Sequence, residues 1–413
     1  MRVCIVGGGG REHALAAALC RTAEVVCTPG NPGIAAVAEC VATAPEAIDA
    51  DLFVIGPEAP LVDGLADRLR AAGRTALGPG ADGARLEGSK AWMKELLVAA
   101  GVPTAGHATF GAADVDAALG YLRERPAPWV VKTDGLAAGK GVLVTDDLDE
   151  AAADVRAKLT GASFGEAGRR IVIEEGLVGP ELSVLALCDG RRAVLLPAAQ
   201  DYKRVGSGGT GPNTGGMGAY SPVPAADDAV MAEVLERAIA PTMAALRRSG
   251  IDYRGILYAG LMLTPDGLRV LEYNVRFGDP ETEVVVPRVD DDLAAWLHAA
   301  ASGALPADQA PRVSPDACVS VVMASDGYPG APRTGMVIDG LADAERVAGV
   351  STYHAGTVLR GDGRLMTAGG RVLAVTGRGP DIEAARAAAY AGVACIDFDG
   401  AHCRDDIALE VAT

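Results

Sequence analysis

The sequence lacks several features that would place it in a broad class of proteins. None of its eight cysteines forms a C-x-x-C pair, so the usual spacing of a zinc or redox motif is absent. A disulfide framework is not expected in a chain of 413 residues. No apolar run is long enough to span a bilayer, and the residues before the first glycine loop do not resemble a signal peptide. We therefore expect a reduced, soluble, cytoplasmic protein with no membrane partner.

Positive charge is also scarce. The formal net charge is −17 and the pI is about 4.8. Binding to nucleic acid needs a basic surface that replaces the counterions of the phosphates, so we expect no nucleic-acid partner. A small anionic ligand is still compatible with this composition, because a few local lysines, arginines and backbone N–H groups are enough to hold it.

The chain is long and apolar enough to form several domains, since 49% of its residues are hydrophobic. Apolar runs alternate with helical segments in residues 1–101, which predicts a doubly wound parallel sheet. Residues 102–310 form a predicted central domain, and the strands spaced along residues 118–188 suggest an antiparallel subdomain within it. Residues 311–413 follow a segment rich in Pro, Ala and Ser and predict a third, α+β domain with one helix at about 381–393. Within the central domain, the sequence predicts a long glycine-rich loop at 200–221, a helix at 227–247 and a hairpin turn at 265–267.

A glycine loop, residues 7–10, lies between the first predicted strand and a helix. Backbone N–H groups at such a position can face an anion. The loop does not match the dinucleotide fingerprint G-x-G-x-x-G, because Glu12 or His13 occupies the last position. Phosphate binding and a tight turn without a ligand both remain possible interpretations.

A second glycine-rich loop runs from Lys132 to Gly141. It differs from a P-loop, because Asp134 replaces the first glycine and Gly141 follows Lys140 where Ser or Thr is required. The loop instead lies between two predicted strands. Such a strand–loop–strand can close over phosphates as a flap, with Lys132 as a fixed positive charge. The alternative is a plain hairpin with a surface lysine.

Acidic residues mark two further segments. Glu181 follows a strand that ends near Glu174, and it could hold the ribose hydroxyls of a nucleotide. Glu272 and Asn274 alternate on a predicted strand, so their side chains share a face with Arg276. Two oxygen ligands on one face suit Mg²⁺, and the arginine could hold a carboxylate or phosphate. The alternative is a surface strand of mixed polarity.

Longer motifs accompany these segments along nearly the whole chain. They are Gly9–His13, Pro29–Asn31, Gly56–Pro60, Leu86–Lys90, Asp134–Gly141, Gln200–Arg204, Thr210–Ser221, Asn274–Glu281, Gly327–Pro329, His354–Thr357 and Gly369–Arg371. Together they resemble the phosphoribosylamine–glycine ligase family of the ATP-grasp superfamily. The resemblance implies an N-terminal parallel-sheet domain, a central ATP-grasp fold with a flap subdomain, and a C-terminal α+β domain.

The resemblance also implies an activity: ATP-dependent ligation of glycine to 5-phosphoribosylamine by a monomeric enzyme that uses Mg²⁺ or Mn²⁺. The implied metal ligands are Glu272 and Asn274. The implied ATP contacts are Lys90, Lys132, Ala137, Gly139, Lys140, Gly141, Glu174, Glu175, Leu177 and Glu181. The implied substrate contacts are Gly9, Gly10, Arg11, Glu12, Asn31, Glu58, Asp201, Asn213, Gly216 and Arg276. The implied catalytic residues are Lys132, Asp201, Asn213 and Arg276.

Three other classes are weighed against this interpretation. Another ATP-grasp ligase would act on a different acid and amine, and the Thr210–Ser221 motif argues against it. A dinucleotide-dependent oxidoreductase conflicts with the failed fingerprint. A nucleotide-binding regulator without activity would not need the set of Glu272, Asn274 and Arg276.

Overall fold

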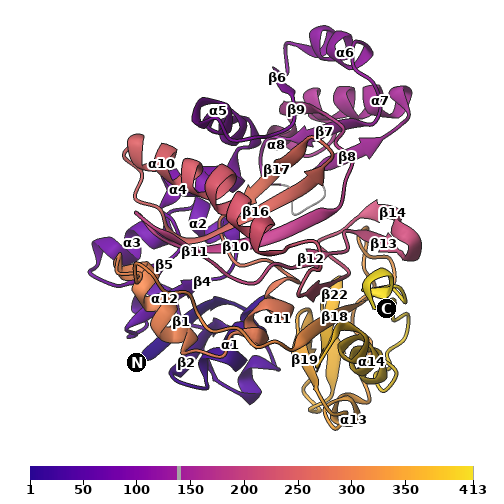
Figure 1. Cartoon of the computed structure of the whole chain (residues 1–413). Helices are drawn as coiled ribbons and strands as arrows, with labels where there is room; N and C mark the ends of the chain where they lie inside the picture. The colour runs from indigo at the N-terminus through magenta and orange to yellow at the C-terminus, as the bar shows by residue number, and fades with distance from the viewer. Residues whose placement is uncertain (137–140, 413) are drawn as a thin grey trace.

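The computed structural model describes residues 1–136 and 141–412. The expected ATP contacts Ala137, Gly139 and Lys140 lie outside these residues. Figure 1 shows the course of the chain from the N-terminal sheet to the C-terminal sheet. Within the described residues, no helix has the length and apolar character needed to cross a membrane.

The N-terminal sheet is parallel, as predicted, with strand order β3-β2-β1-β4-β5. Its strands are β1 (Arg2–Gly7), β2 (Glu24–Pro29), β3 (Glu39–Cys40), β4 (Leu52–Ile55) and β5 (Ala76–Leu77). Its helices are α1 (Gly10–Leu19), α2 (Glu58–Val62), α3 (Leu65–Ala71) and α4 (Ala81–Gly88). The first glycine loop leads directly from β1 into α1, as the sequence indicated.

A small antiparallel sheet forms the upper part of the molecule in Figure 1, with order β6-β9-β7-β8. Its elements are β6 (His107–Gly111), α6 (Val115–Arg123), β7 (Trp129–Thr133), β8 (Val142–Thr145), α7 (Leu148–Leu159), α8 (Gly165–Gly168) and β9 (Arg170–Glu175). Leu122, Val131 and Ile171 belong to its own hydrophobic core. This sheet begins at His107 and ends with β9, and the flap subdomain expected at 118–188 overlaps most of it.

The central sheet is antiparallel with order β11-β10-β16-β17. Its strands are β10 (Glu181–Asp189), β11 (Ala193–Leu195), β16 (Arg254–Thr264) and β17 (Gly267–Asn274). The predicted hairpin between the last two is confirmed, with Thr264 opposite Gly267. The predicted helix at 227–247 is also present, as α9 (Asp228–Val234), a π-helical turn (Leu235–Ile239) and α10 (Ala240–Arg248).

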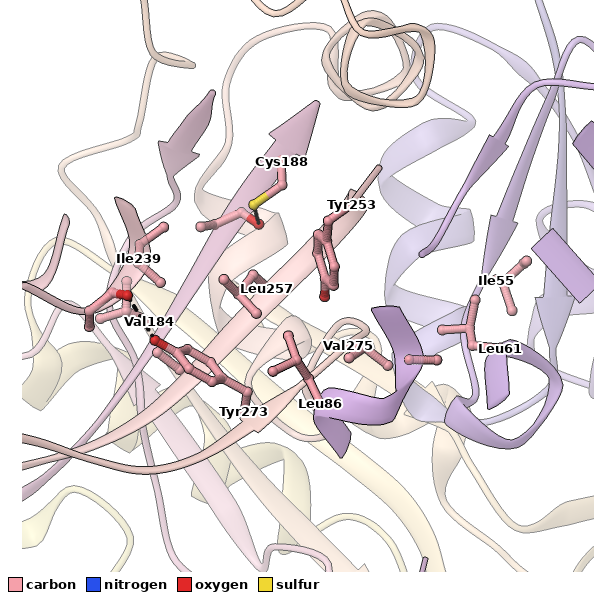
Figure 2. Packing of buried hydrophobic residues seen from close by; sticks show 14 of the residues in the cluster. Ile55, Leu61, Leu86, Val184, Cys188, Ile239, Tyr253, Leu257, Tyr273 and Val275 are labelled. Carbon is pink, nitrogen blue, oxygen red and sulfur yellow. Dashed lines mark hydrogen bonds between the residues drawn. The ribbon is translucent and has the colours of Figure 1, made fainter. Parts of the chain in front are cut away.

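One hydrophobic cluster joins the N-terminal and central sheets. It includes Ile55 and Leu61 from the first domain with Leu257 and Tyr273 from the second. Figure 2 shows Leu86 of α4 between these two groups. Side chains in such a core are closely packed, so the N-terminal domain and β17 are held in a defined relative position.

The segment from Gln200 to Ser221 was expected to be a long loop, and this prediction was wrong. It contains β12 (Gln200–Asp201), β13 (Arg204–Gly206), β14 (Thr210–Asn213) and β15 (Gly218–Ser221). Two of these strands extend the C-terminal sheet, which has order β12-β15-β18-β22-β19. The glycines of residues 200–221 show no strand pattern in the sequence. Strand β15 is nevertheless extended because it pairs with β18, and local propensity plays little part.

The C-terminal sheet packs against the helix predicted near residue 381, which is confirmed as α14 (Ile382–Val393). The other elements are α5 (Lys90–Ala100), α11 (Thr282–Val285), α12 (Leu293–Ser302), β18 (Ala317–Ala324), α13 (Leu341–Ala344), β19 (Val350–His354), β20 (Thr357–Leu359), β21 (Leu365–Thr367) and β22 (Arg371–Gly379).

Candidate active site

The end of β17 presents three polar side chains on one face. Glu272, Asn274 and Arg276 are partly exposed, whereas Tyr273 and Val275 between them are buried in the core. This is the alternation that the sequence predicted. The Arg276 Nη2 atom lies 3.5 Å from Oδ1 of Asn274, so the group acts as one polar surface.

Several cations act on Glu272. Burial alone would raise the pKa of its carboxyl group, but the charges of Lys203, Lys90 and Lys132 hold this pKa below its usual value. The carboxylate is therefore ionised at neutral pH. An ionised carboxylate beside an amide oxygen is a hard-oxygen donor set that fits Mg²⁺, which keeps water or phosphate oxygens in its other positions.

Arg276 connects β17 to the N-terminal domain. Its guanidinium lies 3.1 Å from Oε1 of Glu87 in α4 and 3.4 Å from Oε2 of Glu58, the first residue of α2. Burial opposes ionisation of Glu58, yet the charge of Arg276 lowers its pKa. Burial raises the pKa of Glu87, whose other oxygen accepts a hydrogen bond from the N–H of Val275 at 2.9 Å. The guanidinium is thus held between two carboxyl groups, with one further N–H donating to the Phe277 carbonyl at 3.1 Å.

Two lysines contact one carboxylate at the small antiparallel sheet. The Nζ atoms of Lys132 and Lys94 each lie 3.0 Å from an oxygen of Glu174, one lysine to each oxygen. These charges lower the pKa of Glu174 although the carboxyl group is buried. Lys132 also donates to the Leu271 carbonyl at 3.0 Å, which places its ammonium group beside the residue before Glu272.

The start of α5 is fixed to the second glycine-rich loop. Ser89 caps the helix by accepting a hydrogen bond from the Trp92 N–H at 3.2 Å. Asp134 accepts from the Ala91 N–H at 2.7 Å, and its carbonyl accepts from the Lys90 N–H at 3.2 Å. Asp134, which breaks the P-loop pattern, therefore has a structural role in positioning Lys90.

A third charged group lies at the junction with the C-terminal sheet. Lys203 contacts Glu181 directly, and its Nζ lies 3.6 Å from Oδ1 of Asp201. Burial, despite the opposing charge of Lys203, raises the pKa of Asp201 to about 7. The carboxylate of Glu281 contributes to this rise.

The first glycine loop is stabilised internally by two residues that were expected to bind substrate. Glu12 accepts from the Gly9 N–H at 2.6 Å and pairs with Nε of Arg11 at 2.5 Å. Arg11 also donates to the Phe277 carbonyl at 3.2 Å. Both side chains are buried. In this structure they hold the loop against the segment that follows β17, and Gly9 and Gly10 form the start of α1.

Asn31 is similarly engaged between the N-terminal and C-terminal domains. Its Nδ2 donates to the carbonyls of Gly8 at 3.0 Å and His354 at 2.7 Å, and its Oδ1 accepts from the Ile34 N–H at 2.9 Å. The N–H of His354 donates to Nδ1 of His13 at 2.8 Å. Asn31 thus connects the first glycine loop to the end of β19.

The domain models that match this chain cover most of its length. They are the N domain of phosphoribosylglycinamide synthetase at residues 1–87, its ATP-grasp (A) domain at residues 88–282 and its C domain at residues 318–410. The chain belongs to the phosphoribosylglycinamide synthetase family.

Similar proteins support this membership over the full length. A phosphoribosylamine–glycine ligase of Streptomyces coelicolor is 48% identical over 429 residues, covering 100% of both chains. One from Escherichia coli is 47% identical and covers 98% of both. The crystal structure of phosphoribosylamine–glycine ligase from Thermotoga maritima has a TM-score of 0.86 at 35% identity, covering 98% of this chain and 100% of that one.

A more distant structure shares the fold alone. The biotin carboxylase domain of Hydrogenobacter thermophilus 2-oxoglutarate carboxylase, solved with MgADP, has a TM-score of 0.71 at 16% identity. It covers 97% of this chain and 91% of that chain. The matched ATP-grasp (A) domain, residues 88–282, contains both the central sheet and the small antiparallel sheet, as the sequence indicated.

The remaining residues expected to bind substrates or ATP in this family member lie on several segments. Asn213 ends β14, and Gly216 follows it. Arg371 of β22 donates to the Gly216 carbonyl at 3.4 Å and pairs with Asp279 at 2.9 Å. Glu175 accepts from the Gly106 N–H at 2.7 Å. The predicted contacts Leu177 and Gly141 lie in the loop after β9 and immediately before β8, respectively.

Sequence reasoning missed four charged residues of this site. They are Glu87, Lys94, Lys203 and Arg371. Three of them lie in motifs that the sequence analysis quoted, and Lys94 lies just beyond the Leu86–Lys90 motif. A lysine in an otherwise apolar helical segment could have been noticed, but its partner on β9 could not be found from the sequence.

Proposed function

We propose that this chain catalyses ATP-dependent ligation of glycine to 5-phosphoribosylamine, giving glycinamide ribonucleotide, ADP and phosphate. The observation that carries this proposal is the group of Glu272, Asn274 and Arg276 at the end of β17, together with the charges of Lys90, Lys132 and Lys203 that act on Glu272. These charges suit an anionic nucleotide and a carboxylate substrate together. Membership in the family supports the same substrates, because the curated relatives are named for this reaction.

The reaction requires activation of a carboxylate, which is a poor acyl donor. A carboxylate oxygen of glycine would form a bond to the γ-phosphorus of ATP while the bond to the β–γ bridging oxygen breaks and ADP leaves. The amine nitrogen of phosphoribosylamine would then attack the acyl carbon of glycyl phosphate. Phosphate leaves, and the nitrogen loses a proton. The protein mainly aligns these groups and neutralises charge, as in other phosphoryl transfers.

The residues divide between these tasks. Lys90 and Lys132 would bind phosphate oxygens, and Glu181 would hold the ribose of ATP. Arg276 would orient the glycine carboxylate, because its guanidinium is already fixed by two carboxyl groups. We place Asp201 and Asn213 beside glycine and the transferring phosphoryl group, and the glycine loop beside phosphoribosylamine.

Glu272 and Asn274 would hold the metal ion, which supplies neutralisation of charge on the phosphates when bound. We propose Mg²⁺ as this ion, with Mn²⁺ as a substitute. We also propose that the enzyme is a cytoplasmic monomer.

The test is ADP release in the presence of Mg²⁺ and glycine, with and without freshly prepared 5-phosphoribosylamine. We expect turnover only with both substrates and glycinamide ribonucleotide as the product. Turnover with another acid–amine pair, and none with this one, would overturn the proposed substrates but leave the fold assignment intact.

A further inference from the structure

Lys94 is a buried cation that lies outside the set of residues assigned to ATP. It belongs to α5, and its side chain has no exposed surface. Its Nζ lies 3.0 Å from Oε2 of Glu174 and donates to Oγ1 of Thr104 at 2.7 Å. Lys94 is thus enclosed by protein groups and has no surface to offer a ligand. Any effect on ATP must therefore come from its charge and from the residues that it contacts, not from direct contact with the ligand.

The net charge of Lys94, Lys132 and Glu174 explains why two lysines contact this carboxylate. Glu174 carries one negative charge and lies 3.0 Å from both Lys94 and Lys132. A pair of Lys132 and Glu174 alone would be neutral and would attract phosphates weakly. With Lys94 included, the three side chains carry a net charge of +1, and Lys132 is the member that also reaches the Leu271 carbonyl beside the metal-ligand strand.

We propose that Lys94 is a positioning residue for ATP: it neutralises Glu174 from behind, so that the ammonium group of Lys132 remains an effective cation for the nucleotide phosphates. This inference rests on the proposed function, because it takes Lys132 as a phosphate ligand. The same contact holds Glu174 at the end of β9, where the adenine would lie.

The surroundings of Lys94 maintain its charge. Burial lowers the pKa of Lys94 to about 8, and the carboxylate of Glu174 opposes this effect. The other charged groups that act on it are Lys132 on β7 and Glu272 on β17. A lysine in a site of this kind is retained against a desolvation penalty, which breaking the contact with Glu174 would leave uncompensated.

The test compares the affinities of the protein for ATP and for adenosine. Adenosine has no phosphates, so it reports on the shape of the adenine and ribose pocket but not on charge. In Lys94→Met, the three-residue group loses its net charge. We expect the affinity for ATP to fall about tenfold or more while the affinity for adenosine changes much less, since a unit charge acts strongly over a few ångströms near a protein interior. Equal losses for both ligands would overturn the proposal.

A second substitution separates charge from packing. Adding Glu174→Gln to Lys94→Met restores a net charge of +1 on Lys132, and we expect it to recover most of the lost ratio of ATP to adenosine affinity. Glu95→Gln is the matched control, because Glu95 is an exposed carboxylate on the same helix. Combined with Lys94→Met it makes the same change in total charge but should recover nothing. Recovery with both substitutions, or with neither, would contradict the proposal.

The design remains decisive if Lys94→Met does not fold. Glu174→Gln alone leaves two cations, so adding Lys94→Met to it must still weaken ATP relative to adenosine. Thermal unfolding of each variant identifies those that fold. Failure of the wild-type protein to bind ATP at all would count against the proposed function itself. Normal wild-type binding, with a ratio of ATP to adenosine affinity that Lys94→Met leaves unchanged in both the wild-type and the Glu174→Gln background, would count against the role of Lys94 alone.

Discussion

Replacing Arg276 with methionine should separate the two roles of this residue, which are to hold the domains together and to bind a substrate anion. The wild-type guanidinium is the cation between Glu58 and Glu87. Methionine keeps much of the side-chain volume but removes the charge and every N–H donor. Two carboxyl groups, one of them nearly buried, are then left facing each other without a cation.

The magnitude follows from the burial of these groups. Their side chains are 16% exposed for Arg276 and 10% for Glu87, so the pair is screened little by solvent. Removing one partner of a buried pair costs about 3–5 kcal/mol, and we expect the free energy of unfolding to fall by about 3 kcal/mol at neutral pH. Without the arginine, the carboxyl groups have raised pKa values in the folded state. The variant is therefore least destabilised at low pH, and the loss grows as pH rises through those values.

The assay combines urea unfolding at about pH 5 and pH 8 with glycine-dependent ADP release. Adding Glu87→Gln should recover most of the stability of Arg276→Met but none of its activity, which we expect to fall at least about a thousandfold because a preorganised cation at the reacting group is lost. Arg237→Met is the control, since Arg237 forms an exposed ion pair with Glu233, four residues earlier along the chain. Near-normal activity in Arg276→Met would refute its substrate role, and a loss of stability that Glu87→Gln does not relieve would refute the electrostatic argument.

Three further results are expected. Glu272→Gln removes an ionised oxygen donor, so the Mg²⁺ concentration for half-maximal ADP release should rise about tenfold or more; an unchanged requirement would contradict the metal assignment. Gly33→Ala should lower stability by about 1–3 kcal/mol in thermal unfolding, because an added Cβ would lie 2.5 Å from both His13 and His354; unchanged stability would contradict this. Burial lowers the pKa of His13 to about 3 and of His354 to about 4. The unfolded chain therefore binds more protons, and stability in urea should fall as pH drops below about 6.5, with a weaker dependence in His354→Gln.

The sequence predicted those parts of the site that depend on local periodicity. The alternation of Glu272 and Asn274 on β17, which Arg276 continues just after the strand, is one example, since neighbouring residues on a strand point to opposite faces. The start of α1 after the first glycine loop is another. Both features are set within a few residues of chain, so no knowledge of distant partners is needed to infer them.

The sequence could not predict features that depend on pairing between distant segments. Strand β15 is extended because it pairs with β18, about a hundred residues later, whereas the glycines of residues 206–218 favour no regular structure. Likewise, the family resemblance implies Arg11 and Asn31 as substrate contacts. The contacts of Arg11 with Phe277 and of Asn31 with His354 become visible only when the three domains are assembled.

These long-range contacts indicate how assembly of the domains is linked to catalysis. Arg276 joins the end of β17 to α2 and α4, Lys132 joins the small antiparallel sheet to the same strand, and Arg371 joins the C-terminal sheet to Asp279 shortly after it. Each contact is charged and connects a different domain to one segment, residues 271–279. Because a charged group left without its partner in a buried position is costly, separation of any one domain would be opposed at the site itself. Strand β17, which we propose to carry the metal ligands, thus has its orientation set from three sides before any substrate binds, which is the preorganisation that phosphoryl transfer requires.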